Sequence, residues 1–160
     1  MKRVLYALLL ILAGGMAWIR LAPDDPVRWN RPSYGMQDPI WTPGAKRDLP
    51  GPDAVRQTPA GAVAVVKVRG ARAETVLADL DAIALATPRS VRLAGSPAEG
   101  RITWVTRSAF FGFPDYTTAD VRQDGSDVDL ALYARQRYGR RDQGVNATRL
   151  RDWLARLAAD

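Results

Sequence analysis

The stretch RYGRRDQGVN, residues 137–146, holds the residue types best suited to chemistry. It contains three arginines, an aspartate, two glycines and an asparagine. Arginine grips a phosphate or carboxylate through a planar fork of donors, so Arg137, Arg140 and Arg141 are candidate ligands of an anion. The glycines fit neither a G-x-G-x-x-G nor a Walker pattern. A loop entering a helix N-terminus still presents unpaired N–H groups that favour anions.

A row of candidates lies on the strand predicted just before this loop. Tyr133, Arg135 and Arg137 alternate with apolar residues, so they share one face of a sheet while the apolar face packs under helices. Two interpretations stay open. The row binds a phosphate or a carboxylated polymer, or it is a solvated face whose arginines pair with Asp115, Asp120 or Asp142.

The composition excludes most familiar catalytic arrangements. The chain has no cysteine and no histidine, which removes disulfides, thiol nucleophiles, the usual zinc ligands and the Ser-His-Asp triad. The segment 124–129 lacks the spacing and terminal glutamate of a calcium loop, so we predict a hairpin turn there, no metal site and no cofactor. An enzyme would have to use carboxylates, for which Asp115 and Asp142 are the candidates.

Arginine dominates the charge of this chain. The 160 residues carry a formal net charge of +6, and their 23 basic residues are 20 arginines and three lysines. This balance suits an acidic partner or a phosphate, and arginine spread over solvated faces explains it equally. No recognisable nucleic-acid-binding motif accompanies the arginines, so we predict no nucleic-acid partner.

Residues 1–22 predict a membrane anchor. Two basic residues precede an apolar run over 4–19, and positive charges keep the N-terminus in the cytoplasm. The run is short for a span of about 20 residues, which Arg20 can extend by reaching the headgroups. A cleaved signal peptide and a buried core helix are the alternatives. A retained anchor and a cleaved signal peptide both place the domain on the periplasmic side of a bacterial inner membrane. A retained helix would cross that membrane once.

The elements that would position the candidates lie in residues 61–160. Residues 23–60 hold eight of the 11 prolines and no regular period, which predicts an extended spacer. Some of its aromatic residues are expected to dock on the domain or to lie at the membrane surface. The order β-α-β-β-β-β-α predicts the α+β class, an antiparallel sheet of about five strands with two helices packed on one face. Strands are predicted at 62–69, 90–95, 100–108, 115–123 and 127–137, with helices at 73–85 and after Asn146.

Two local features refine this arrangement. Asn146 is predicted to cap the last helix, with Val145 and Leu150 at the spacing of a hydrophobic staple. Gly139 and Gly144 are then expected to let the chain turn in the loop before this helix.

The second feature is the apolar segment FFGFPDY, residues 110–116. Its three phenylalanines are predicted to fill the core. The alternative is a loop tip that faces a membrane or a ligand.

The C-terminal residues resemble a known family. RYGRRDQGVNATRLRDWL is similar to the signature S-R-x-G-x-x-D-x-G-x-N-x-x-R of the bacterial family catalogued as domain of unknown function 1499, and Phe113 and Asp115 resemble its upstream aromatic–Asp segment. The resemblance spans roughly residues 61–158. It implies a single fold and an envelope location, and no established reaction. The signature falls on Arg137, Gly139, Asp142, Gly144, Asn146 and Arg149.

Three hypotheses for the function follow. The first is a non-catalytic, membrane-anchored envelope domain that binds an anionic partner. That partner is a lipid headgroup, an envelope polymer or an acidic protein surface. In the second, the cluster is scaffold, and Asp142 pairs with Arg137 or Arg149. The third is an enzyme that uses carboxylates. The candidate ligand residues are Tyr133, Arg135, Arg137, Arg140, Arg141 and Arg149.

Overall fold

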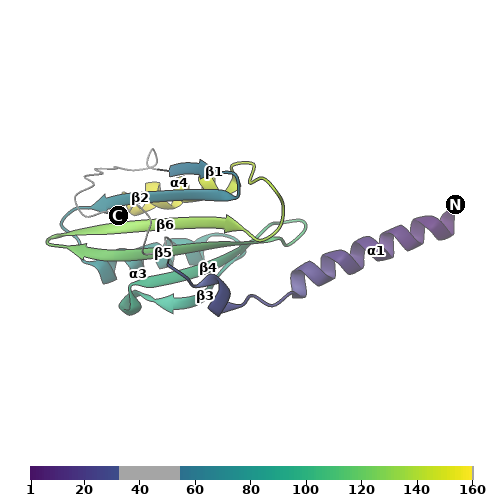
Figure 1. Cartoon of the computed structure of the whole chain (residues 1–160), viewed down its shortest axis with the longest axis horizontal. Helices are drawn as coiled ribbons and strands as arrows, with labels where there is room; N and C mark the ends of the chain where they lie inside the picture. The colour runs from purple at the N-terminus through teal and green to yellow at the C-terminus, as the bar shows by residue number, and fades with distance from the viewer. Residues whose placement is uncertain (33–54, 160) are drawn as a thin grey trace.

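The computed structural model describes residues 1–32 and 55–159 (Figure 1). A long helix, α1 (Lys2–Leu21), and a short helix, α2 (Pro26–Trp29), come first. The domain that follows contains β1 (Val55–Thr58), β2 (Gly61–Val68), α3 (Ala73–Ala86), β3 (Ser90–Ser96), the 3-10 turn η3 (Pro97–Glu99), β4 (Arg101–Arg107), β5 (Pro114–Asp124), β6 (Asp127–Gln136) and α4 (Val145–Leu157).

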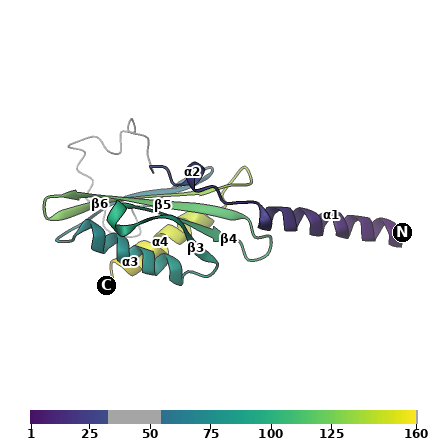
Figure 2. The ribbon, with the colours of Figure 1, turned by 90° about the horizontal axis from the view of Figure 1, so that it is seen from below.

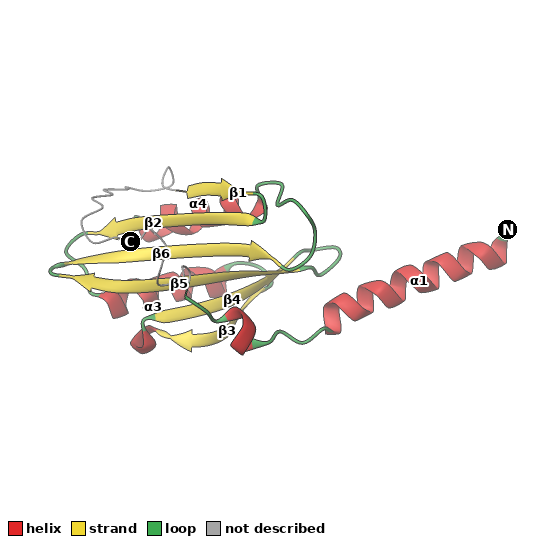
Figure 3. Ribbon diagram, in the orientation of Figure 1, coloured by secondary structure: helices red, strands yellow, loops and turns green. Residues whose placement is uncertain are grey.

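The strands form one sheet in the order β1-β2-β6-β5-β4-β3, and every neighbouring pair is antiparallel (Figure 3). This confirms the α+β class, with one strand more than predicted. The additional strand, β1, comes from the stretch predicted to be a spacer. Its four residues lie at the sheet edge, where Val55 pairs with Ala64 and is buried. A strand this short shows too little alternation to be recognised among prolines.

Helices α3 and α4 cover one face of the sheet, as predicted (Figure 2). Leu130, Leu132 and Ala134 of β6 point into this layer and are fully buried. Trp104 of β4 meets Trp153 of α4 edge to face, with 5.5 Å between the ring centroids. The inner face of the sheet is therefore the main core of the domain.

The opposite, outer face of the sheet is partly covered by α2. Asp25 caps this short helix by accepting a hydrogen bond of 2.9 Å from the Val27 amide, and Pro26 occupies the first helical position. Trp29 is 9% exposed, and its ring stacks on Tyr116 with 3.8 Å between centroids. The prediction that an aromatic residue of this stretch docks on the domain is confirmed for Trp29. Tyr34 and Trp41 lie outside the described residues.

Helix α1 has the length and composition of a membrane span. It has 20 residues, a mean hydropathy of 2.0 and no burial against the domain, and no other helix in the described residues qualifies. A single-pass anchor and a signal sequence both fit these properties.

The last helix begins differently from the prediction. Gly144, with a φ of 87°, is the N-cap residue, and Asn146 lies inside the first turn, so Asn146 is not the cap. Asp142 supplies the side-chain bonds instead, because its carboxylate oxygens lie 3.2 and 3.3 Å from the Asn146 amide nitrogen. The staple prediction is also wrong: Val145 is 58% exposed while Leu150 is buried.

The loop between β4 and β5 does not fill the core. Phe110 is 70% exposed and Phe111 is 39% exposed, so the core-filling prediction is wrong for both. The loop extends past the end of the sheet, where α3 and α4 do not cover it (Figure 1). Phe113 is partly buried and contacts Tyr138 of the β6–α4 loop, with 5.9 Å between ring centroids.

Candidate functional site

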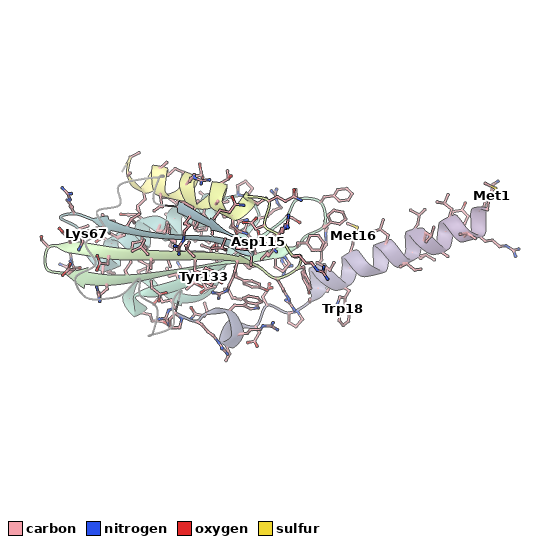
Figure 4. The ribbon with its side chains drawn as sticks, turned by 45° about the horizontal axis from the view of Figure 1, so that its top comes forward. Met1, Met16, Trp18, Lys67, Asp115 and Tyr133 are labelled. Atoms are coloured by element: carbon pink, nitrogen blue, oxygen red, sulfur yellow. The ribbon has the colours of Figure 1, made fainter. Side chains whose placement is uncertain are left out.

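The alternation predicted for β6 places the candidate row on the outer face. Tyr133 and Arg135 are partly buried there, opposite the leucine face that α3 and α4 cover. Figure 4 marks Tyr133 on the sheet. Register pairs Tyr133 with Val63 of β2 and Thr118 of β5, so the row runs along the middle of the sheet.

Tyr133 and Arg135 form one wall of a cleft whose other wall is α2. The cleft has a volume of about 740 Å³, and we call it the outer cleft. The Arg135 guanidinium donates to the Trp29 carbonyl and lies 4.9 Å from the Tyr133 ring centroid. The residues lining it are Asp25, Val27, Arg28, Trp29, Arg31, Pro32, Tyr133 and Arg135.

Two arginines of the outer cleft were not among the candidates predicted from the sequence. Arg28 and Arg31 come from the proline-rich stretch, and both are exposed. Burial lowers the pKa of Arg135, and the charge of Arg31 lowers it further. Among the described residues, three guanidinium groups therefore share this cleft with one carboxylate, that of Asp25. The sequence signal was Asp25-Pro26, a cap followed by a first-turn proline, which marks a short helix and hence a fixed position for Arg28 and Arg31.

Arg137 does not join the outer cleft. Its Nη1 donates to the Pro23 carbonyl at 3.0 Å and to the Tyr116 hydroxyl at 3.3 Å, and lies 3.8 Å from Asp24 Oδ1. Tyr116 donates to the same Asp24 oxygen at 2.5 Å. Burial and the Asp24 contact raise the pKa of Tyr116 to about 12. Arg137 thus holds the segment that links α1 to α2.

Three signature residues lie at or just before the start of α4 and form a cluster with Asp115 of β5. Asp115 Oδ2 accepts from Asn146 Nδ2 and from Arg149 Nη2, each at 3.2 Å. Arg149 Nη1 donates to Asn146 Oδ1 at 2.7 Å. Asp142 completes the group through the Asn146 amide. We call Asp115, Asp142, Asn146 and Arg149 the signature cluster.

The scaffold hypothesis paired Asp142 with Arg137 or Arg149. In the structure the ionic partner of Arg149 is Asp115, and Asp142 caps the helix instead. The reason is geometric: Asp142 lies before the first turn of α4, where the unpaired amides of that turn point toward it.

Comparison with protein families gives a match over residues 42–157 to the DUF1499 family, described as proteins of unknown function. The chain belongs to the DUF1499 family. No curated protein matches it. The matched range takes in β1 to α4 and leaves out α1 and α2, so the DUF1499 domain supplies one wall of the outer cleft and the segment before it supplies the other.

A pocket of about 510 Å³ opens beside the signature cluster of the DUF1499 domain, between the β4–β5 and β6–α4 loops. Asp115 and Asp142 both line it, with Gln136. The Gln136 Nε2 atom is buried and has no hydrogen-bond partner among the described residues. Burial raises the pKa of Asp115. The ion pair with Arg149 opposes this shift, and the charge of Asp142 adds to it.

The remaining candidates lie on the β6–α4 loop. Gly139 has a φ of 101°, which turns the chain, and Arg140 and Arg141 after it are exposed. Arg141 lines the pocket beside the cluster. The structure therefore places the predicted arginines in four positions: Arg135 in the outer cleft, Arg137 against the segment before α2, Arg149 in the signature cluster, and Arg140 and Arg141 on this loop. Within the described residues, no group of three or more acidic side chains has an arrangement that suits a metal ion.

Proposed function

We propose that this DUF1499 protein is a membrane-anchored domain of the bacterial envelope that binds an anionic ligand in the outer cleft. Helix α1 anchors the chain in the inner membrane, with its N-terminus in the cytoplasm and the domain on the periplasmic side. Arg28, Arg31 and Arg135 hold the anion, and Tyr133 contacts it. The observation that carries the proposal is the meeting of three guanidinium groups in one cleft with one carboxylate.

The carboxylate of Asp25, which lines the outer cleft, already accepts hydrogen bonds from backbone amides. Asp25 Oδ1 lies 2.9 Å from the Val27 amide and 3.4 Å from the Arg28 amide, so it serves the start of α2. The charges of Arg31 and Arg135 repel each other, as the lowered pKa of Arg135 reflects together with its burial. A phosphate or carboxylate between them would relieve that repulsion, and the partly desolvated position strengthens the attraction.

The shape of the outer cleft favours an anionic group carried on a chain. A volume of about 740 Å³ is that of a small-molecule site, whereas a protein partner generally needs a broad, flat contact area. The Tyr133 and Trp29 rings add apolar contact beside the charges. A phosphate- or carboxylate-bearing envelope polymer fits this combination.

In this proposal the other predicted arginines do not bind the anion. Arg137 and Arg149 are structural, since Arg137 holds the segment before α2 and Arg149 pairs with Asp115. Arg140 and Arg141 lie outside the outer cleft.

Binding of poly(glycerol phosphate) to the full chain in detergent micelles tests this proposal. Arg31→Gln is the informative variant, because its Nε donates 3.3 Å to the Val27 carbonyl and the side chain is otherwise exposed. We expect calorimetry to show about tenfold weaker binding, equivalent to about 1.4 kcal/mol. The matched control is Arg72→Gln, which removes the same charge beside the β5–β6 hairpin. Equal affinity in Arg31→Gln and wild type contradicts the proposal.

A second candidate function uses the pocket beside the signature cluster. Asp115 and Asp142 both line this pocket, and burial raises the pKa of Asp115. A pair of carboxyl groups in one pocket is the kind of arrangement that general acid–base catalysis uses. A panel of ester and phosphodiester substrates offered to wild type and Asp115→Asn tests it. Turnover that disappears in the variant supports an enzyme, and equal rates in both proteins count against one.

A further inference from the structure

The end of the domain nearest α1 gathers arginines that neither proposal uses. Antiparallel register pairs Ser90 at the start of β3 with Thr106 near the end of β4. Arg89 and Arg107 therefore lie at the same end of the sheet. Figures 1 and 2 both show α1 leaving the domain from this end.

These two arginines and Arg20 of α1 line a pocket of about 430 Å³. None of the described residues that line it is acidic, and its other walls are largely apolar. The full lining is Arg20, Arg89, Val91, Val105, Arg107, Ser108, Ala109 and Gly112. We call this the juxtamembrane pocket.

Each of the three arginines donates one hydrogen bond to a backbone carbonyl oxygen. Arg20 Nη2 donates to the Phe110 carbonyl at 2.7 Å, Arg107 Nη1 to Gly112 at 3.1 Å, and Arg89 Nε to the Arg107 carbonyl at 3.1 Å. Arg107 also pairs with Asp24 at 2.6 Å. Each guanidinium has five N–H donors, so these bonds fix the groups in place and leave further donors for an anion.

The rim of the juxtamembrane pocket is apolar and exposed. Phe110 is 70% exposed on the loop that Arg20 contacts, and Phe111 next to it is 39% exposed. Trp18, one turn before the end of α1, is 76% exposed (Figure 4). Exposed aromatic rings beside arginines are typical of the membrane–water interface.

The length of α1 fixes the level of this pocket relative to a bilayer. Its 20 residues span about 30 Å at 1.5 Å per residue, which equals the usual hydrocarbon thickness. Arg20, in the last turn, then lies at the headgroups, and so does the pocket it lines.

We infer that the juxtamembrane pocket binds the phosphate of an anionic phospholipid in the outer leaflet of the bilayer that α1 crosses. Arg20, Arg89 and Arg107 surround the phosphate, and Phe110 and Phe111 enter the boundary between headgroups and acyl chains. The domain is thereby held against the membrane surface. This inference rests on the anchoring of α1 in the proposed function and is independent of the outer cleft.

The absence of cysteine allows a clean experiment with a single engineered thiol. The full chain carrying Phe110→Cys is labelled with the polarity-sensitive dye NBD and placed in nanodiscs of phosphatidylcholine, with or without phosphatidylglycerol. Ser126→Cys, in the exposed hairpin turn at the other end of the sheet, is the control position. We expect blue-shifted emission and quenching by spin-labelled lipid at position 110, water-like emission at 126, and stronger embedding with phosphatidylglycerol.

The charge requirement is tested in the same labelled chain. Arg89→Gln should lower the ratio of docked to undocked domain about fivefold, because one basic residue near an anionic surface contributes about 1 kcal/mol. The control Arg72→Gln should leave that ratio unchanged. Water-like emission at 110, equal embedding in both lipid mixtures, or an equal effect of the two variants overturns the inference. A chain that fails to enter nanodiscs overturns the anchoring instead, and the docking with it.

Discussion

Two opposing effects act on the pKa of Asp115 in the signature cluster: burial and the charge of Arg149. Burial raises its pKa above the ordinary value of 3.8, while Arg149 stabilises its charged form. Because burial prevails, the folded protein binds this proton more tightly than the unfolded chain does. The carboxyl therefore stabilises the fold fully below pH 3.8, and this contribution is lost as the pH rises through the folded-state pKa.

Asp115→Asn should remove that pH dependence. We expect the free energy of unfolding of wild type, relative to the variant, to fall as the pH rises above 3.8. Denaturant unfolding of the full chain in detergent micelles at a series of pH values measures the difference. A difference that grows with pH would show that Arg149, and not burial, governs the proton on Asp115.

Asp129 provides a comparison of opposite sign. Burial acts to raise its pKa, but hydrogen bonds from Arg122 and Lys67 outweigh burial and hold the pKa below 3.8. Its contribution to stability is present above the ordinary pKa and is lost as the pH falls. Wild type relative to Asp129→Asn should therefore lose stability on acidification, the reverse of the Asp115 result.

Asp142 accepts the hydrogen bond of the Asn146 amide in the first turn of α4, and its removal should destabilise the domain. Asp142→Ala leaves the buried Asn146 amide without its acceptor, which costs about 1 kcal/mol and lowers the melting temperature by several degrees. Asp142→Asn keeps one acceptor oxygen and should cost less. Asp152→Ala, an exposed change on the same helix, is the control. Circular dichroism of the full chain reports the three melting temperatures, and equal values for Asp142→Ala and the control would contradict the capping role.

At the scale of elements, α2 is fastened to the sheet by aromatic stacking and by arginines. Trp29 stacks on Tyr116, and its carbonyl accepts from Arg135. A helix of four residues has no stability of its own, so these contacts must hold it in place. The outer cleft exists only while this attachment lasts.

Trp29→Ala should release α2 from the sheet. We expect trypsin to cut faster after Arg28, because a protease needs a locally unfolded segment, while the sheet and its core remain intact. Mass spectrometry of timed digests identifies the cut sites. Trp18→Ala, on the exposed surface of α1, is the matched control. Unchanged cutting in Trp29→Ala would mean that other contacts suffice to hold α2.

The elements also show how far sequence patterns reach. The alternation in β6 correctly separated Tyr133 and Arg135 from Leu132, since side chains alternate along any strand. The same approach missed β1 and α2, because four residues hold too little periodicity to stand out. It also misplaced the α4 cap, because Asn146 fits the preferred residue type while the chain actually turns at Gly144.

At the scale of the whole molecule, α1 and the domain give the protein two distinct ends. Figure 1 shows α1 leaving one end of the sheet and the β5–β6 hairpin at the other. With α1 in a membrane, the hairpin is the part of the sheet farthest from the bilayer, and the basic N-terminus remains on the opposite side.

This orientation predicts a labelling pattern for single cysteines. Ser126→Cys should react with a membrane-impermeant maleimide in intact spheroplasts, whereas Lys2→Cys should react only after permeabilisation. Gel shifts of the labelled full chain measure both. Labelling of Lys2→Cys in intact spheroplasts would reverse the proposed topology, and release of Ser126→Cys into the soluble fraction would indicate cleavage of α1.

Local sequence patterns suffice to predict the α+β class, the apolar helix at the N-terminus and the two faces of β6. Each of these depends on periodicity or composition within a short window, which local physics controls. Which charged side chains meet depends instead on the folded arrangement of the whole chain. Arg135 reaches the carbonyl of Trp29 across 106 positions, and Arg149 pairs with Asp115 rather than with Asp142. Such contacts depend on strand order and on where short segments dock, and no local pattern encodes either.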